Sequence, residues 1–234
     1  PRLKRVKQPH QHTPFFWDIL KESKIENILI DLLGKDISLK TSKLNTKAPG
    51  GGAAVEWHQD WAFYPHTNDN VLALGLMIND VDLDNGPLMV IPKSHKGPVL
   101  SHNNNGVFCG AIDPNDKNFD ISKAVTLTGK ARSMTIHHAR TLHGSAPNNS
   151  NKDRLMLFYE CNSADAWPLV GVGAYLNNTN PIDLCNQMER QMLCGNVSYQ
   201  PRMESVPVVL PLPPAPDYGS IFTTQKTGGA KSAF

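Results

Sequence analysis

Two amphipathic segments near the start of the chain predict helices. In the first, a Thr-Pro pair has the residue types of an N-cap and a first helical position, and apolar residues follow at helical spacing. In the second, Ser23 and Glu26 have the spacing of a capping box, and Gly34 is placed to end the apolar run. We therefore expect flanking helices within residues 13–34, the second of them over about residues 23–33.

The rest of the pattern consists of short apolar or alternating runs separated by turn residues, which is typical of strands. The predicted strands cover residues 37–46, 55–64, 71–79, 87–91, 133–137, 140–145 and 154–161. An Asn85-Gly86 pair supplies the positive φ angles of a tight turn between two of them. The segment 101–120 is rich in Asn and Asp, so we expect a long surface excursion there. The pattern predicts a mainly β sandwich or barrel.

Composition narrows the class without identifying a partner. The chain has 234 residues, 40% hydrophobic and 19% charged, which suits a single domain over residues 1–234. Its net charge of +2 gives no reason to expect nucleic acid or an acidic membrane as partner. No apolar run has the roughly 18 residues of a membrane-spanning helix, and no signal peptide follows Pro1, so we expect a cytoplasmic protein whose start is truncated or processed.

The C-terminal segment 201–234 is rich in proline over its first half. Six prolines between residues 201 and 216 exclude a regular helix in that part, so we expect an extended tail. Such a tail either wraps its own domain or reaches a neighbouring subunit, and a homo-oligomer formed through it is one of the two expectations.

A histidine and a carboxylate two positions apart carry the most informative chemistry. In a strand, His58 and Asp60 project to the same face, side by side. His143 is the best candidate for a third ligand, and two imidazoles with one carboxylate leave open positions on a metal, as in non-haem Fe(II) oxygenases. By the same alternation Tyr64 lines the substrate pocket, whereas Trp61 reaches the pocket only through a bulge or a strand end.

The residues after His143 suggest a carboxylate-binding clamp. A hairpin folded about Asn148 and Asn149 places Arg154 opposite His143, with Ser145 projecting to the same face. An arginine with a neighbouring hydroxyl binds a carboxylate through forked, charge-assisted hydrogen bonds. A dianion that chelates the metal at one end and contacts the arginine at the other is 2-oxoglutarate.

These motifs together resemble the phytanoyl-CoA dioxygenase family, which includes ectoine hydroxylases. The resemblance rests on the His58 and Asp60 pair, on the run NGPLMVIPKSH that begins at Asn85, and on His143-Gly144-Ser145 followed by Arg154, within about residues 37–162. It implies a cupin-like double-stranded β-helix, or jelly roll. It also implies Fe(II) on His58, Asp60 and His143, 2-oxoglutarate on Arg154 and Ser145, and Asn45 as a further co-substrate contact.

The resemblance implies an O2-dependent hydroxylation of a small organic substrate, with release of succinate and CO2. Related halogenases replace the carboxylate ligand by a small residue, so the intact Asp60 favours hydroxylation over halogenation. Leu76 stands where phytanoyl-CoA hydroxylases tend to have a tryptophan, and the substrate itself is not identified. Two alternatives stay open: a cupin-type hydrolase or isomerase with another divalent metal, and a catalytically inactive binding module.

Overall fold

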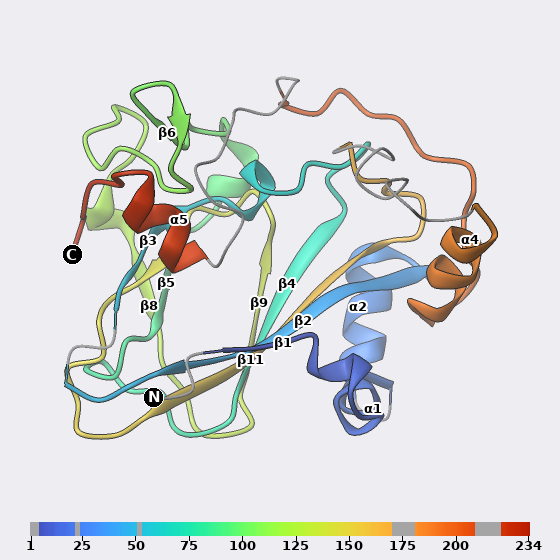
Figure 1. Ribbon diagram of the computed structural model, residues 1–234, viewed down its shortest axis with the longest axis horizontal. Coiled ribbons are helices and arrows are strands. Elements are labelled where there is room, and N and C mark those ends of the chain that lie inside the picture. Colours follow the sequence, from blue (N-terminus) through green and yellow to red (C-terminus); the bar gives the residue numbers. More distant parts are fainter. Residues whose placement is uncertain (1–4, 22–23, 51–52, 170–180, 209–220) are drawn as a thin grey trace.

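Two antiparallel sheets face each other in the computed structural model, which describes residues 5–21, 24–50, 53–169, 181–208 and 221–234 (Figure 1). The major sheet contains β1 (Arg5–Lys7), β2 (Ile37–Lys47), β11 (Arg154–Ser163), β4 (Val71–Met77) and β9 (Met134–His138), in that order, with β12 (Met192–Cys194) also paired to β2. The minor sheet contains β3 (Val55–His58), β10 (His143–Ser145), β5 (Leu88–Val90) and β8 (Val125–Leu127), in that order. This is the arrangement of the predicted double-stranded β-helix, and it does not close into a barrel.

Short helices and a small ribbon complete the described part of the chain. The helices are α1 (Phe15–Lys21), α2 (Ile25–Leu33), α4 (Pro181–Arg190) and α5 (Ile221–Thr227), with 3-10 turns η1 (Pro9–Gln11), η2 (Asp60–Ala62), η3 (Ser94–Lys96) and η4 (Ile121–Lys123). The strands β6 (Asn103–Asn104) and β7 (Val107–Phe108) form a two-stranded ribbon. None of the described helices combines the length and the apolar composition that crossing a bilayer requires.

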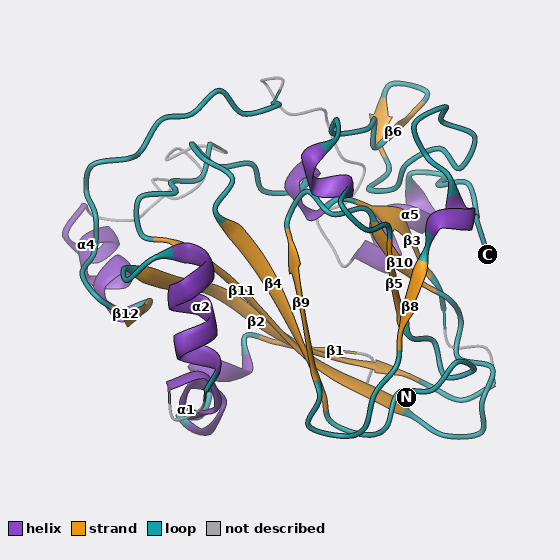
Figure 2. Cartoon of the chain, turned by 180° about the vertical axis from the view of Figure 1, so that it is seen from behind, coloured by secondary structure: helices purple, strands orange, loops and turns teal. Residues whose placement is uncertain are grey.

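The main hydrophobic core lies between α1, α2 and the outer face of the major sheet (Figure 2). Leu20 of α1 and Leu29 of α2 are fully buried there, as are Leu74 of β4 and Leu157 of β11. Full burial of one such side chain stabilises the fold by about 1.5–3 kcal/mol. This core explains why the two predicted helices lie where they do: each has one apolar face, and the sheet covers it.

The inner face of the major sheet is polar and faces the minor sheet. Directly opposed residues of an antiparallel pair share a face. The pairs of β2 with β11 on this face are Lys43 with Phe158, Asn45 with Met156, and Lys47 with Arg154. The strands therefore alternate between an apolar outer face and an inner face that carries several basic residues.

Two expectations about the strands are wrong. The predicted strand 55–64 ends at His58, and Asp60 begins the 3-10 turn η2. The predicted hairpin does not form either, because His143 pairs with His58 and with Val90 in the minor sheet, while Arg154 pairs with Lys47 in the major sheet. The linker between His143 and Arg154 thus connects two sheets, and strict strand alternation does not bring His58 and Asp60 together.

Two loop segments are more structured than expected. Within residues 101–120, Ile112 and Phe119 pack against Trp57 in a second core cluster, so this segment is partly buried rather than a surface excursion. In the tail, residues 201–208 contain no helix or strand, as expected, but α5 contradicts the prediction of an extended chain to residue 234. The prolines from 211 to 216 lie outside the described residues.

Candidate metal and co-substrate site

Three side chains on the minor sheet place their ligand atoms together. His58 ends β3, Asp60 begins η2, and His143 begins β10 as the Cα partner of His58. Nε2 of His58 lies 3.5 Å from Oδ1 of Asp60, and Nε2 of His143 lies 3.8 Å from the same oxygen. The ligand atoms of the three residues all lie within 4.8 Å of one another, and all three residues are buried.

The backbone orients both imidazoles toward the centre of this group. Nδ1 of His58 lies 2.8 Å from the carbonyl oxygen of Glu56, and Nδ1 of His143 lies 2.8 Å from that of Thr141. A carbonyl only accepts, so each Nδ1 carries the proton and donates it. Each Nε2 then presents a lone pair, which is the form in which histidine binds a metal.

The carboxylate between the histidines is held in its ionised form. Burial alone would raise the pKa of Asp60, but the neighbouring imidazoles of His143, His137 and His58 outweigh it and place the pKa well below its ordinary value. Burial and the neighbouring His58 lower the pKa of His143 well below its ordinary value. An ionised carboxylate beside a neutral imidazole is the donor set that a divalent transition metal requires.

Gln59 fixes the turn between the two ligands of β3 and η2. Its side chain is fully buried. Nε2 of Gln59 donates to the carbonyl oxygens of Pro98 and Arg140, and its Oε1 accepts from the N–H of Leu100. Its backbone N–H donates to Nε2 of His102 at 2.8 Å. This network accounts for the end of the strand at His58.

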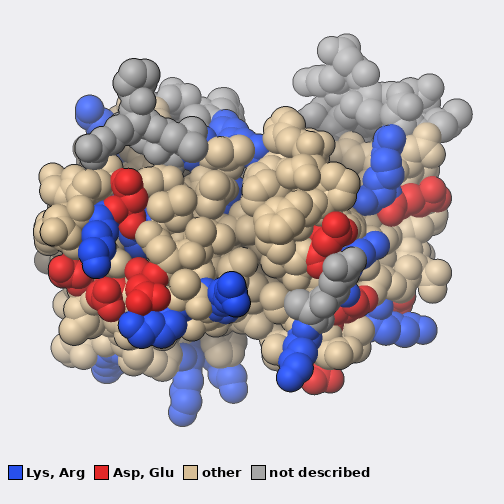
Figure 3. Space-filling view, turned by 90° about the horizontal axis from the view of Figure 1, so that it is seen from below, with Lys and Arg blue, Asp and Glu red and all other residues tan. Residues whose placement is uncertain are grey.

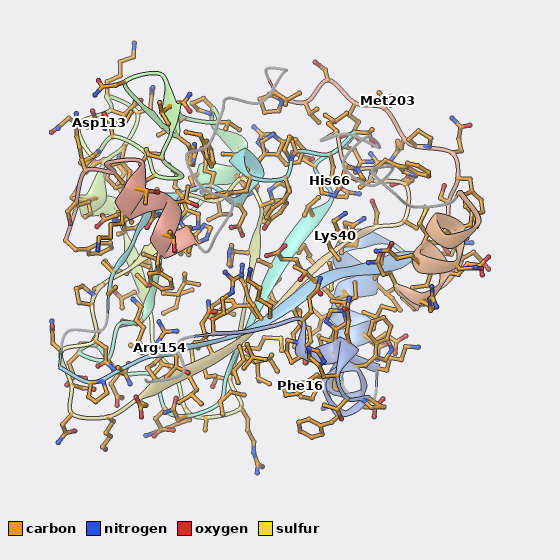
Figure 4. All side chains as sticks on the ribbon, in the orientation of Figure 1. Phe16, Lys40, His66, Asp113, Arg154 and Met203 are labelled. Atoms are coloured by element: carbon orange, nitrogen blue, oxygen red, sulfur yellow. The ribbon has the colours of Figure 1, made fainter. Side chains whose placement is uncertain are left out.

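A second part of the site comes from the major sheet. Arg154 is 5% exposed, and its Nε has no hydrogen-bond partner among the described residues. Burial lowers the pKa of its guanidinium to about 10. Lys47 is the Cα partner of Arg154 and donates to Oγ of Ser145 at 2.7 Å, so Lys47 connects the strand of Arg154 with Ser145 of the facing sheet, and no hairpin is involved. Figure 4 shows Arg154 toward one end of the major sheet, with Lys40 and His66 toward the other.

Of the other predicted site residues, Asn45 and Tyr64 lie near the site, whereas Trp61 packs elsewhere. Asn45 lies on the inner face, and its Oδ1 is buried without a partner among the described residues. The hydroxyl of Tyr64 is buried, and burial together with the charge of Asp60 raises its pKa well above the ordinary value, so it lies beside the ligands. The indole of Trp61 instead packs against Val71, and its Nε1 donates to the carbonyl oxygen of Pro207.

Several side chains at this site were not singled out in the sequence. Lys43 donates to Glu160 at 2.9 Å on the inner face, and Glu160 and Asp60 raise the pKa of Lys43 against the effect of burial. His137 of β9 has its Nε2 3.7 Å from Oδ2 of Asp60 and its ring 4.4 Å from that of His143. An isolated charged residue or histidine belongs to no sequence motif, so the proximity of Lys43 and His137 to the site becomes visible only once the strands are paired.

The residues present fit both a metal and a carboxylate co-substrate. Two neutral imidazole nitrogens and one carboxylate form a compact ligand set for Fe(II). The buried Arg154, whose Nε has no partner in the described part of the chain, lies close enough to Lys47 to lower the pKa of that amine. Two buried cations side by side are costly unless an anion accompanies them, and the distal carboxylate of 2-oxoglutarate would supply that charge.

Relatives of known class share this chain's sequence over most of its length. A protein of Stutzerimonas stutzeri named "Probable alpha-ketoglutarate-dependent hypophosphite dioxygenase" is 40% identical over 228 residues, which cover 96% of this chain and 76% of that protein. An ectoine dioxygenase of Stutzerimonas stutzeri (strain A1501) is 28% identical over 67% of this chain. The chain spans 57% of the length of that ectoine dioxygenase.

Solved structures share the fold. The carbocyclase SnoK from nogalamycin biosynthesis, described as non-heme and alpha ketoglutarate dependent, has a TM-score of 0.64 at 23% identity and covers 76% of this chain and 70% of its own. EctD from S. alaskensis with 2-oxoglutarate and 5-hydroxyectoine has a TM-score of 0.58 at 24% identity, over 69% of this chain and 56% of its own. The phytanoyl-CoA dioxygenase (PhyH) family model matches residues 2–156. The chain therefore belongs to the phytanoyl-CoA dioxygenase family of non-haem iron dioxygenases that use 2-oxoglutarate.

Proposed function

We propose that the protein oxidises a small anion in a reaction that consumes 2-oxoglutarate and O2 and releases succinate and CO2, and that hypophosphite is the first candidate. The observation that carries the proposal is the His58–Asp60–His143 group, with the buried Arg154 supplied by the facing sheet. Identity of 40% to the hypophosphite dioxygenase of Stutzerimonas stutzeri supports the substrate. This anion is inorganic, which departs from the organic substrate that the family resemblance implied.

Each residue has a defined task in this proposal. His58, Asp60 and His143 would hold Fe(II), and Arg154 and Ser145 would bind the distal carboxylate of 2-oxoglutarate, with Asn45 as a further polar contact. The bound metal and O2 would supply the oxidising power, and the protein would supply orientation and exclusion of water. Tyr64, buried beside Asp60, would form part of the substrate pocket wall.

The charges on the inner face favour an anionic substrate. Among the described residues of the major sheet this face carries Arg5, Lys7, Lys43, Lys47 and Arg154 but only one acid, Glu160. The positive charge of these residues and of a divalent metal together exceeds the negative charge that one dianionic co-substrate brings. Lys43 and Arg5 lie beside Glu160, away from the Lys47–Arg154 end, so they would attract the second anion. On the face of the molecule that Figure 3 shows, basic and acidic side chains are interspersed.

The metal and co-substrate assignment can be tested without a substrate. Anaerobic protein with Fe(II) and 2-oxoglutarate is expected to show a weak visible charge-transfer band, because the co-substrate chelates the metal. His58→Ala and Asp60→Ala should each abolish the band, while His12→Ala, a change at an exposed histidine, should retain it. A band that survives both ligand substitutions would contradict the assignment, and succinate formation that requires iron would exclude a zinc or nickel hydrolase.

The substrate assignment has its own test. One oxygen atom inserted into a P–H bond turns hypophosphite into phosphite, while the second oxygen atom of O2 enters succinate. We expect hypophosphite to stimulate succinate release with an equal amount of phosphite formed, and L-proline and ectoine to give no stimulation. Lys43→Met should raise the KM for hypophosphite roughly 10-fold or more and leave the affinity for 2-oxoglutarate unchanged. Stimulation by ectoine instead would overturn the anionic substrate.

A further inference from the structure

Lys47 is a buried lysine whose side-chain nitrogen donates hydrogen bonds to one short segment of the facing sheet, residues 145–146. It ends β2 and is 3% exposed. Its Nζ donates to Oγ of Ser145 at 2.7 Å and to the carbonyl oxygen of Ser145 at 3.0 Å, and it also donates to the carbonyl oxygen of Ala146. In its ammonium form, which a bound dianion favours, this nitrogen has three protons, and the three acceptors use all of them.

The Asn85-Gly86 turn holds this lysine in place. Gly86 has φ +78°, and a Cβ at that position would lie 2.7 Å from the carbonyl oxygen of Ala146 and 2.9 Å from Cδ of Lys47. Asn85 braces the turn, because its side chain accepts from the N–H of Asp82 and donates to the carbonyl oxygen of Asp80. Only glycine combines this backbone conformation with so close an approach. The turn therefore seats Lys47 against β10.

The contact with Lys47 decides what the hydroxyl of Ser145 can do. Oγ of Ser145 is an acceptor toward Lys47, which leaves its O–H proton to be donated elsewhere. Ser145 is 7% exposed, so an acceptor must reach it inside the protein. Arg154 lies on the other side of Lys47, with an Nε that has no partner among the described residues. The charged groups that influence Lys47 are Arg154 from β11 and Glu56 from β3.

We infer that Lys47 is a positioning residue of the co-substrate subsite, which orients the Ser145 hydroxyl as a donor to the distal carboxylate of 2-oxoglutarate and adds a second positive charge beside Arg154. The inference rests on the proposed function. The inference goes beyond that function by assigning the Asn85-Gly86 turn and Lys47 to the recognition of the distal carboxylate of 2-oxoglutarate. Lys47 acts through Ser145 and through its charge, since its own protons are already bound.

Direct binding to the anaerobic Fe(II) protein tests this role. The dissociation constants of 2-oxoglutarate and of pyruvate are measured by titration, because pyruvate keeps the metal-chelating end and lacks the distal carboxylate. Lys47→Met is expected to weaken 2-oxoglutarate binding roughly 10- to 100-fold and to leave pyruvate binding unchanged. Lys130→Met, the same change at an exposed lysine, should alter neither constant.

A double-mutant cycle separates positioning from a merely structural role. Ser145→Ala should weaken 2-oxoglutarate binding, and Lys47→Met combined with Ser145→Ala should lose less than the product of the two single effects. If Lys47→Met does not fold, Ser145→Ala tests the same hydrogen bond with the lysine in place, and unchanged 2-oxoglutarate binding would overturn the inference. Equal losses for 2-oxoglutarate and pyruvate would also overturn it. Failure of the unaltered protein to bind 2-oxoglutarate would instead refute the proposed function.

Discussion

At the scale of the residue, Lys47 gives the protein a pH dependence of predictable sign. Burial, followed by the charge of Arg154, lowers its pKa from 10.5 to about 6 in the folded protein. Between these values the unfolded chain binds the proton and the folded chain does not. The free energy of unfolding therefore rises with pH above about 6, by up to about 1.4 kcal/mol per pH unit from this group.

We expect the protein without co-substrate to gain stability from Lys47 between pH 6 and pH 8. The affinity for 2-oxoglutarate should change in the opposite direction, because a dianion favours the ammonium form and binding then requires uptake of a proton. Urea unfolding and 2-oxoglutarate titrations at pH 6, 7 and 8 measure the two quantities. In Lys47→Met both pH dependences should be reduced, and an undiminished dependence would assign them to other groups.

The three proposed metal ligands could be singled out from sequence, whereas the residues that support them could not. His58, Asp60 and His143 have recognisable spacing, and the structure brings them together even though the strand that was expected to align the first two ends early. Lys47 and Gln59 carry no such signal. Lys47 acquires its role from a partner 98 residues away in the chain, across two sheets, and this pairing is not encoded in any local pattern.

At the scale of the element, α5 completes the exposed edge of the minor sheet. β3 is an edge strand, so its backbone groups lack a neighbouring strand on one side. The side chain of Gln225 accepts from the N–H of Glu56 and donates to the carbonyl oxygens of Glu56 and Gly110. The amide side chain of Gln225 thus takes the place of a neighbouring strand's peptide group at Glu56, which lies two residues before His58.

Removal of this amide should destabilise the edge and loosen the metal site. We expect Gln225→Ala to lower the free energy of unfolding by about 1–3 kcal/mol, because buried backbone groups lose their partners, and to weaken Fe(II) binding. Lys226→Ala, at the exposed neighbouring position of the same helix, is the matched control. Thermal unfolding and an Fe(II) titration measure both effects. Equal behaviour of the two variants would show that α5 does not support β3.

The sequence predicted which segments form helices and strands better than it predicted how the strands are connected and paired. The amphipathic helices at 13–34 form because their apolar faces match the outer face of the major sheet, and most predicted strands are present. The hairpin between His143 and Arg154 is absent because β10 belongs to the minor sheet and β11 to the major sheet. A polar linker looks the same whether it folds back or crosses over, so the local pattern cannot distinguish the two connections.

At the scale of the whole molecule, the site is divided between the two sheets. The three metal ligands lie on the minor sheet or on the turn that follows β3, whereas Arg154 and Lys47 lie on the major sheet. Ser145, proposed for the distal carboxylate, shares β10 with His143, whereas Arg154 comes from the other sheet and Lys47 joins the two sheets through its bonds to Ser145 and Ala146. A ligand that joins a metal on one sheet to a guanidinium on the other should therefore tie the sheets together.

Metal and co-substrate should consequently stabilise the protein cooperatively. Fe(II) alone restrains one sheet, and 2-oxoglutarate alone lacks its chelating partner, so the increase in Tm with both present should exceed the sum of the separate increases. At 100 times its dissociation constant a ligand that binds only the folded state contributes about 2.7 kcal/mol. Pyruvate with Fe(II) should give a smaller increase, because it cannot reach Arg154, and EDTA should reverse the increases that depend on Fe(II). Anaerobic thermal unfolding under these conditions measures the coupling, and strictly additive increases would mean that the co-substrate does not bridge the sheets.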